Sequence, residues 1–167
     1  MISAQRTVSA AGVLTGLAVA ALLVIATHVP ASSRPLGADV RVTVTPPGEL
    51  RVERGGVLVA ARDLLAGSAA RGGVRIRNIA GGAVRVRFCV GARRHDLDSA
   101  LELSLRAGRR TLAVGALGEL RRASRPLRIP RGGARTIAAR AWLDPSASGY
   151  EGRSAQVAIR PRVQVPR

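Results

Sequence analysis

The sequence predicts an all-β fold: an antiparallel β-sandwich, jelly-roll or immunoglobulin-like, preceded by one N-terminal hydrophobic helix. Three observations carry this prediction. Short segments such as VRVRF at residues 84–88 alternate apolar and charged residues with period two, which is typical of strands with one buried face. Turns rich in Gly and Pro separate these segments at short intervals. An uncharged apolar stretch, residues 8–29, comes before all of them.

That apolar stretch predicts export. It is long enough to span a bilayer as a helix, and it also resembles a secretory signal with a long core. Val29-Pro30-Ala31 places small residues at positions −3 and −1 of a cleavage after Ala31. Without cleavage the segment is an N-terminal membrane anchor, and arginines on both sides leave its orientation open. We expect residues 1–31 to be a signal peptide or anchor, residues 32–38 a linker and residues 39–167 the β-sandwich domain.

The strands follow in order. Residues 40–44 alternate cleanly and end at a Pro-Pro-Gly turn, and two short apolar runs follow them before the centre of the chain. In the second half, residues 101–105 alternate again, although residues 97–105 could instead open as a helical turn, because Leu97, Ala100, Leu101 and Leu105 also fit helical spacing. A proline at position 161 predicts an edge position or a bulge in the last strand. The expected strands are residues 40–44, 50–52, 57–60, 74–78, 84–90, 101–105, 111–117, 127–129, 134–143 and 154–165.

The centre of the chain predicts a hairpin with a charged face. Residues 74–78 and 84–90 alternate apolar residues with arginine, and Gly81-Gly82 between them can supply a tight turn. If the two arms pair, their apolar residues line one face and need a second sheet to cover them. The opposite face then carries the candidate anion-binding residues Arg75, Arg77, Arg85 and Arg87.

The charge of the chain allows two explanations. Its 27 basic residues, all arginine, against 10 acidic ones give a formal net charge of +17. Arginine binds phosphate and carboxylate in bidentate fashion, which favours an anionic partner. A chain rich in Ala, Arg, Gly, Val and Pro without lysine is equally typical of GC-rich coding bias. The single cysteine, Cys89, cannot form a disulfide within the chain.

Other motifs give no catalytic site. Three Arg-Gly-Gly triplets, beginning at Arg54, Arg71 and Arg131, each precede an apolar run and are interpreted as turns. The cluster around His95 and Asp96 has too few ligands for a metal. We interpret Cys89 as lying on the arginine face, and the only Trp, residue 142, as a core residue. No zinc-peptidase, serine-hydrolase or phosphate-loop motif is present, so we expect no catalytic residue, no metal and no cofactor.

Two segments resemble a known family. Leu65-Ala66-Gly67-Ser68, followed by residues 74–78 (VRIRN), resembles its "L-x-P-G-[DE]-S … I-x-V-x-N-x-G" pattern. Residues 142–145 (WLDP), with residues 149–157 (GYEGRSAQV) and Gln164, resemble its closing "N-x-Y-Q-G-x-S … Q" strand. The family is the TasA/camelysin-like family of exported matrix-fibre and spore-coat-associated proteins. The resemblance implies a jelly-roll-like sandwich, a cleaved signal and, in some members, assembly into surface fibres. Ala66 and Glu151 depart from its usual proline and glutamine.

These observations give one leading hypothesis and two alternatives. The leading one is an exported, non-enzymatic structural protein of the cell surface or extracellular matrix, with self-assembly into fibres. The first alternative is an arginine-rich binding module for anionic polysaccharide or lipid headgroups, without specific nucleic acid recognition. The second is a camelysin-like peptidase, although no residue here matches a zinc motif.

Overall fold

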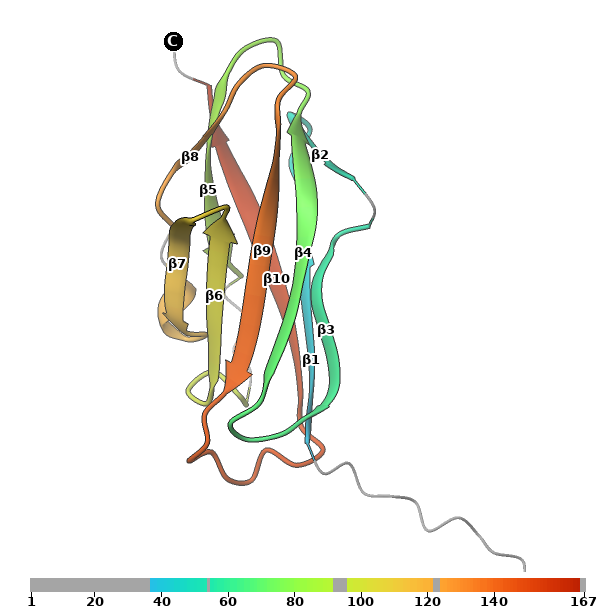
Figure 1. Cartoon of the computed structure of the whole chain (residues 1–167), viewed down its shortest axis with the longest axis vertical. Coiled ribbons are helices and arrows are strands. Elements are labelled where there is room, and N and C mark those ends of the chain that lie inside the picture. Colours follow the sequence, from blue (N-terminus) through green and yellow to red (C-terminus); the bar gives the residue numbers. More distant parts are fainter. Residues whose placement is uncertain (1–36, 54, 92–95, 122–123, 166–167) are drawn as a thin grey trace, which may run out of the picture. The chain divides into compact units, whose positions relative to one another are not determined.

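Two β-sheets make up the structure, a computed structural model that describes residues 37–53, 55–91, 96–121 and 124–165 (Figure 1). Each sheet has five strands. Sheet A has the order β3 (Val57–Leu64), β1 (Ala38–Val44), β10 (Ser154–Gln164), β5 (Val84–Val90) and β8 (Leu127–Ile129). Sheet B has the order β2 (Leu50–Glu53), β4 (Ala69–Asn78), β9 (Ala134–Leu143), β6 (Leu101–Ala107) and β7 (Arg110–Ala116). A short 3-10 helix, η1 (Glu119–Arg121), follows β7.

A single hydrophobic core joins the two sheets. Alternate residues along each strand are buried, as the period-two patterns predict, and the buried side chains of both sheets form one cluster. Leucine, isoleucine, valine and alanine fill it, and Phe88 is its one aromatic residue among those described. The prediction of an all-β protein with two sheets is therefore confirmed.

One ladder departs from the predicted antiparallel arrangement. β1 pairs with β10 in parallel, with Val42 opposite Val157, whereas it pairs with β3 antiparallel, with Val42 opposite Val59. Parallel strands need a long connection between them, and here nearly the whole domain provides it. β1 therefore lies inside sheet A, with a partner on each side.

The strand positions agree with the predicted ones, with differences at the ends. β5, β8 and β9 have the expected bounds, whereas β3 and β4 are longer, because β4 starts at Ala69 and β3 continues to Leu64. The segment 97–105 opens with a helical turn, as the alternative expected, and then continues as a strand. Residues 97–100 form a turn closed by the N–H of Leu101 bonding to Leu97 O (2.8 Å), and β6 begins there.

Pro161 lies at a local edge, as predicted. β1 ends at Val44, opposite Ile159, so beyond that point β10 has only β5 beside it in the sheet. Pro161 is opposite Phe88 of β5. A residue without an N–H is tolerated there because one side of β10 makes no ladder.

The predicted N-terminal helix and the cleavage site after Ala31 lie outside the described residues. Within the described ranges, no helix has the length and apolar character needed to cross a membrane.

Candidate functional site

The four arginines of the predicted anion site lie on two different sheets. β4 pairs with β2 and β9 in sheet B, whereas β5 pairs with β10 and β8 in sheet A. The two arms therefore do not pair with each other, and the predicted hairpin is wrong. Their apolar residues do share one core, but they meet across the sandwich and not side by side. Arg75 and Arg77 are exposed on sheet B, and Arg85 and Arg87 are exposed on sheet A.

The physical reason for this separation lies at the end of β4. Asn78 is fully buried, and its side-chain N–H groups donate to the carbonyl oxygens of Gly82 (2.8 Å), Ile129 (3.1 Å) and Pro130 (3.1 Å). Its side-chain oxygen accepts from the N–H of Ala80 (2.9 Å). These bonds hold the connection as it crosses from sheet B to sheet A. Neither Gly81 nor Gly82 adopts the positive φ expected of a tight turn.

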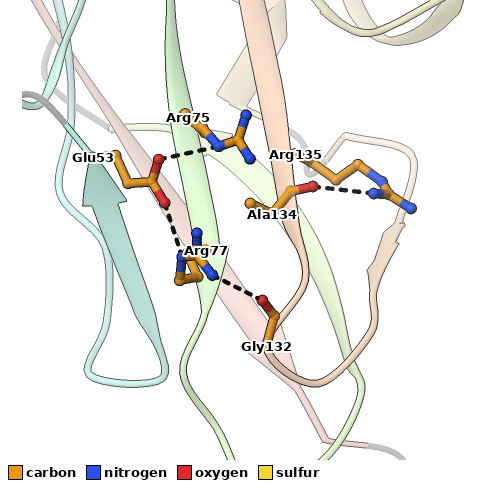
Figure 2. A network of polar contacts seen from close by, with 6 residues as sticks. All are labelled: Glu53, Arg75, Arg77, Gly132, Ala134 and Arg135. Carbon is orange, nitrogen blue, oxygen red and sulfur yellow. Dashed lines mark hydrogen bonds and ion pairs between the residues drawn. The ribbon is translucent and has the colours of Figure 1, made fainter.

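On sheet B, one carboxylate pairs with both Arg75 and Arg77 of β4 (Figure 2). Glu53 of β2 lies opposite Arg75, and its two oxygens pair with Arg75 Nε at 3.0 Å and Arg77 Nε at 2.8 Å. Arg77 also donates to the carbonyl oxygen of Gly132 (3.2 Å). This half of the predicted site is therefore already occupied by a group of the protein itself.

On sheet A, three further arginines join Arg85 and Arg87. Arg162 of β10 lies directly opposite Arg87, and Arg128 of β8 lies directly opposite Arg85. Arg160 of β10 lies two residues before Arg162, on the same exposed face. We call this set the arginine face; it consists of Arg85, Arg87, Arg128, Arg160 and Arg162.

No acidic residue balances the arginine face. β5, β8 and β10 contain these five arginines and no Asp or Glu. Among the described residues, none of the five has a carboxylate within ion-pair distance, whereas Arg75 and Arg77 share Glu53. Like charges directly opposite each other on neighbouring strands are destabilising. The arrangement therefore costs stability unless an anion lies against it.

Cys89 lies next to the arginine face but is not part of its surface. It is opposite Arg160 on β10, as expected from its phase in the strand. It exposes only 8 % of its surface, and next to it in β5 the carbonyl oxygen of Phe88 accepts from the N–H of Ser124 (2.8 Å). The thiol is thus shielded from solvent.

The charged loop before β6 is only partly described, and His95 lies outside the described residues. Asp96 Oδ2 pairs with Arg153 NH1 at 2.8 Å, which ties this loop to the start of β10. Within the described ranges, no group of three or more His, Cys, Asp or Glu side chains could hold a metal ion.

The Arg-Gly-Gly triplets differ from one another. Gly132 lies in a turn with φ of 66°, as predicted, and Gly55 has φ of 64°, although Arg54 before it lies outside the described residues. Gly72 and Gly73, by contrast, lie inside β4, so the turn predicted there is wrong. At Gly72 a side chain would collide with β3, because a Cβ would lie 2.0 Å from Leu58 O.

The only tryptophan lies outside the core, so its interpretation as a core residue is wrong. Ala141 and Leu143 are buried, and Trp142 between them points to the outer face of sheet B. Its indole N–H donates to Gly67 O (3.2 Å). A shallow recess of about 330 Å³ lies beside it, lined by Trp142, Glu102, Ser104 and Arg140.

The two segments that resemble the TasA/camelysin-like family contact each other. The N–H of Gly67 donates to Leu143 O (2.8 Å), and the N–H of Leu143 donates to Ser68 O (3.1 Å). The N–H of Ala66 donates to the hydroxyl of Tyr150 (3.3 Å). Residues about 80 positions apart thus form one joined corner at the end of sheet B.

The chain matches no protein-family model and no curated protein.

Proposed function

We propose that this chain is an exported, non-enzymatic structural protein of the cell surface or extracellular matrix that assembles by exchanging β1 between copies. The proposal rests on the position of β1. It is the first described strand, and it lies inside sheet A between β3 and β10. A terminal strand that fills an internal slot can be supplied by its own chain or by a neighbouring copy.

The strand order supports a jelly roll with β1 as an insertion. Without β1 and β2, the remaining strands run β3-β10-β5-β8 and β4-β9-β6-β7. Numbered from one to eight, these are 1-8-3-6 and 2-7-4-5, the two-sheet double Greek key of a jelly roll. β1 then occupies the place where the first and eighth strands of a jelly roll would pair. The joined corner formed by the two family-like segments further supports the TasA/camelysin-like resemblance.

The contacts of β1 explain why its slot must be filled. Ala38, Val40, Val42 and Val44 are each at most 4 % exposed and all belong to the core. Burying each valine side chain stabilises the fold by about 1.5–3 kcal/mol, so the three together match a large part of a typical domain stability. An empty slot is therefore costly, and a β1 from any copy relieves it.

The connection after β1 suits exchange. Thr45 to Glu49 join β1 to β2 through a tight turn that the N–H of Leu50 closes by donating to Pro47 O (3.0 Å), and Pro46 and Pro47 restrict the backbone angles available to it. Short hinge loops under strain favour swapping an element to a neighbouring copy. Because each copy would both give and receive a β1, the contact is head-to-tail and can continue into a fibre.

A pair of engineered cysteines tests this proposal. Arg41 of β1 lies opposite Ala60 of β3, so Arg41→Cys with Ala60→Cys in a Cys89→Ser background places a disulfide across the slot. If β1 is exchanged, oxidised assemblies separate on a non-reducing gel as covalent multimers. A matched pair within the β6–β7 hairpin, Glu102→Cys with Ala116→Cys, should link only within one chain.

Two results would contradict the proposal. Multimers whose Arg41→Cys/Ala60→Cys links all form within single chains would show that β1 stays in its own domain. A protein that remains monomeric at high concentration and high salt, where repulsion between copies is screened, would exclude the structural role itself.

Binding of an anionic surface polymer is the second candidate function. It is favoured by the arginine face of sheet A, where five guanidinium groups lack a carboxylate partner among the described residues. Binding by all four residues of the original candidate site is not favoured, because Arg75 and Arg77 lie on the other sheet and share Glu53.

A further inference from the structure

We infer that the arginine face of sheet A is a binding site for one extended chain of an anionic polysaccharide that carries carboxylate or sulfate groups. This inference deepens the second candidate function. It adds Arg128, Arg160 and Arg162 to the site, removes Arg75 and Arg77 from it, and specifies the class of ligand. It holds for the single folded domain and does not depend on exchange of β1.

The five arginines occupy neighbouring positions in the regular grid of strand residues. Neighbouring strands lie about 4.8 Å apart, and alternate residues of one strand lie about 6.7 Å apart. Arg87 and Arg162 occupy one row across the strands, and Arg85 and Arg128 occupy the next. Arg160 begins a third row opposite Cys89. Positive charges therefore repeat in both directions over three adjacent strands.

The segregation of charge argues against coding bias as the whole explanation. Such bias raises the number of arginines but does not choose which acidic residues lie among them. Sheet B also has opposed arginines, Arg71 with Arg140 and Arg51 with Arg77, but its outer face carries Glu53 and Glu102 among them. In sheet A the acidic residues Asp39 and Asp63 lie on β1 and β3. β5, β8 and β10 carry none, so opposed pairs such as Arg87 and Arg162 keep their repulsion in the unbound protein.

The shape of the face favours a chain over a small anion. The five arginines project from an open strand surface, whereas a small ligand is held by a concave pocket that covers most of it. A polymer with a charge on successive sugars can pair with several arginines at once, and each further contact is then intramolecular. The planar guanidinium also matches carboxylate and sulfate oxygens in bidentate fashion.

Other polyanions fit the face less well. Stacking of nucleic acid bases needs aromatic side chains, but Phe88 of β5 points into the core and Trp142 lies on sheet B. Insertion into a lipid surface needs exposed apolar side chains, and β5, β8 and β10 expose no large ones. A saccharide chain requires neither.

Binding of the full chain, in a non-ionic detergent, to polygalacturonate and dextran sulfate tests the inference, with neutral dextran as the blank. The test variant changes all five arginines of the face to glutamine. The matched control changes five exposed arginines of sheet B to glutamine: Arg51, Arg71, Arg106, Arg135 and Arg140. Both variants lower the formal net charge equally, from +17 to +12 (17 − 5 = 12).

We expect the test variant to bind at least about tenfold more weakly than the unchanged protein, and the control variant to stay within about threefold. The affinity of the unchanged protein should fall linearly with the logarithm of salt concentration, and the test variant should have the shallower slope. Equal losses in the two variants would overturn the inference, since they would show an effect of net charge alone.

A footprint on the unchanged protein covers the case in which the test variant does not fold. Bound polygalacturonate should protect the arginine face from phenylglyoxal while Arg51 and Arg135 of sheet B remain reactive, as measured by mass spectrometry of peptides. Uniform protection would overturn the inference. So would tighter binding to phosphatidylglycerol vesicles or to single-stranded DNA than to either polysaccharide, because the face would then serve a lipid or a nucleic acid.

Discussion

Ser124 and Phe88 bond to each other twice. The N–H of Phe88 donates to the hydroxyl of Ser124 (2.9 Å), and the N–H of Ser124 donates to the carbonyl oxygen of Phe88 (2.8 Å). β8 begins at Leu127, opposite Val86, so Ser124 continues the edge of sheet A ahead of β8. The hydroxyl and the N–H of this serine, which lies in the connection before β8, thus take the place of two hydrogen bonds between strands.

Replacement of this serine should destabilise the domain. Ser124→Ala leaves the buried N–H of Phe88 without its partner, and an unsatisfied buried donor costs about 1–3 kcal/mol. Urea unfolding followed by fluorescence should show that loss in the free energy of unfolding. Ser104→Ala, on the outer face of sheet B, is the control and should change it by less than about 0.5 kcal/mol. Equal stabilities for the two variants would contradict this role of Ser124.

A side chain at Gly72 should push β3 away from β4. The Cβ of Gly72→Ala would lie 2.0 Å from the backbone oxygen of Leu58, so one of the two strands must move. Overpacking of this kind costs about 1–3 kcal/mol. Gly81→Ala is a matched control, because a Cβ there meets nothing within 4 Å and its φ is not positive. Thermal unfolding should separate the two variants, and an unchanged melting temperature for Gly72→Ala would show that the strands lie further apart.

Reversal of one charge on the arginine face should stabilise the free protein. Arg162→Glu converts the opposed pair with Arg87 into an attractive one, which we expect to add about 0.5 kcal/mol at low salt. The gain should shrink at 1 M salt, where screening acts over about 3 Å. Arg106→Glu makes the same change in net charge opposite Thr111 and Ala138 and is the control. Equal gains from both variants would indicate a general charge effect.

Acid should loosen the turn after β9. The hydroxyl of Ser146 (2.6 Å) and then its backbone N–H (2.7 Å) donate to Asp144 Oδ1 and lower the pKa of this carboxyl below its ordinary value of 3.8. A lowered folded-state pKa means that the contribution of the group is present above the unfolded value and is lost as pH falls through the folded one. NMR titration should therefore place the midpoint of Asp144 below 3.8, and Ser146→Ala should raise it. A midpoint unaffected by Ser146→Ala would contradict this cause.

Export can be tested directly. A reporter fused after Arg167 should reside outside the cytoplasmic membrane, because residues 8–29 form a long uncharged apolar stretch. Deletion of residues 1–31 should retain the same reporter in the cytoplasm. Cell fractionation measures both, and mass spectrometry of the native protein locates the mature N-terminus. Cytoplasmic residence of the full-length fusion would contradict every extracellular role proposed for this chain.

Local pattern predicted the strands, but it could not predict their partners. Alternation in residues 84–90 gives β5 with its correct bounds, because the period of two is a property of the strand alone. Pairing depends on distant contacts. Asn78 bonds to Ile129, 51 positions away, and this contact directs the chain across the sandwich where a Gly-Gly turn suggested a hairpin. Asn78 is the only asparagine in the sequence, and it lies between a strand pattern and a glycine turn. This position was the sequence feature that could have indicated the crossing between the sheets.

The same limit applies to the candidate site. Arg85 and Arg87 were identified because they alternate within one strand, but Arg128 and Arg160 are brought beside them only by the order of sheet A. Composition could not distinguish the arginines of β4 from those of β5 either. That distinction depends on Glu53, which β2 brings to the β4 pair through a sheet register that no local pattern encodes.

The parallel pairing of β1 with β10 also affects the order in which the strands can join during synthesis. Thr43 Oγ1 donates to Val157 O across 114 positions of sequence (3.5 Å), so the first strand to be synthesised waits for the last. At 5–20 residues per second, translation alone takes roughly 6–23 s to supply the second partner of β1. During that interval β3 can cover only one side of β1, and its other side stays open. Until its own β10 joins the sheet, β1 is held on one side only, and this is when it is most easily given to a neighbouring copy.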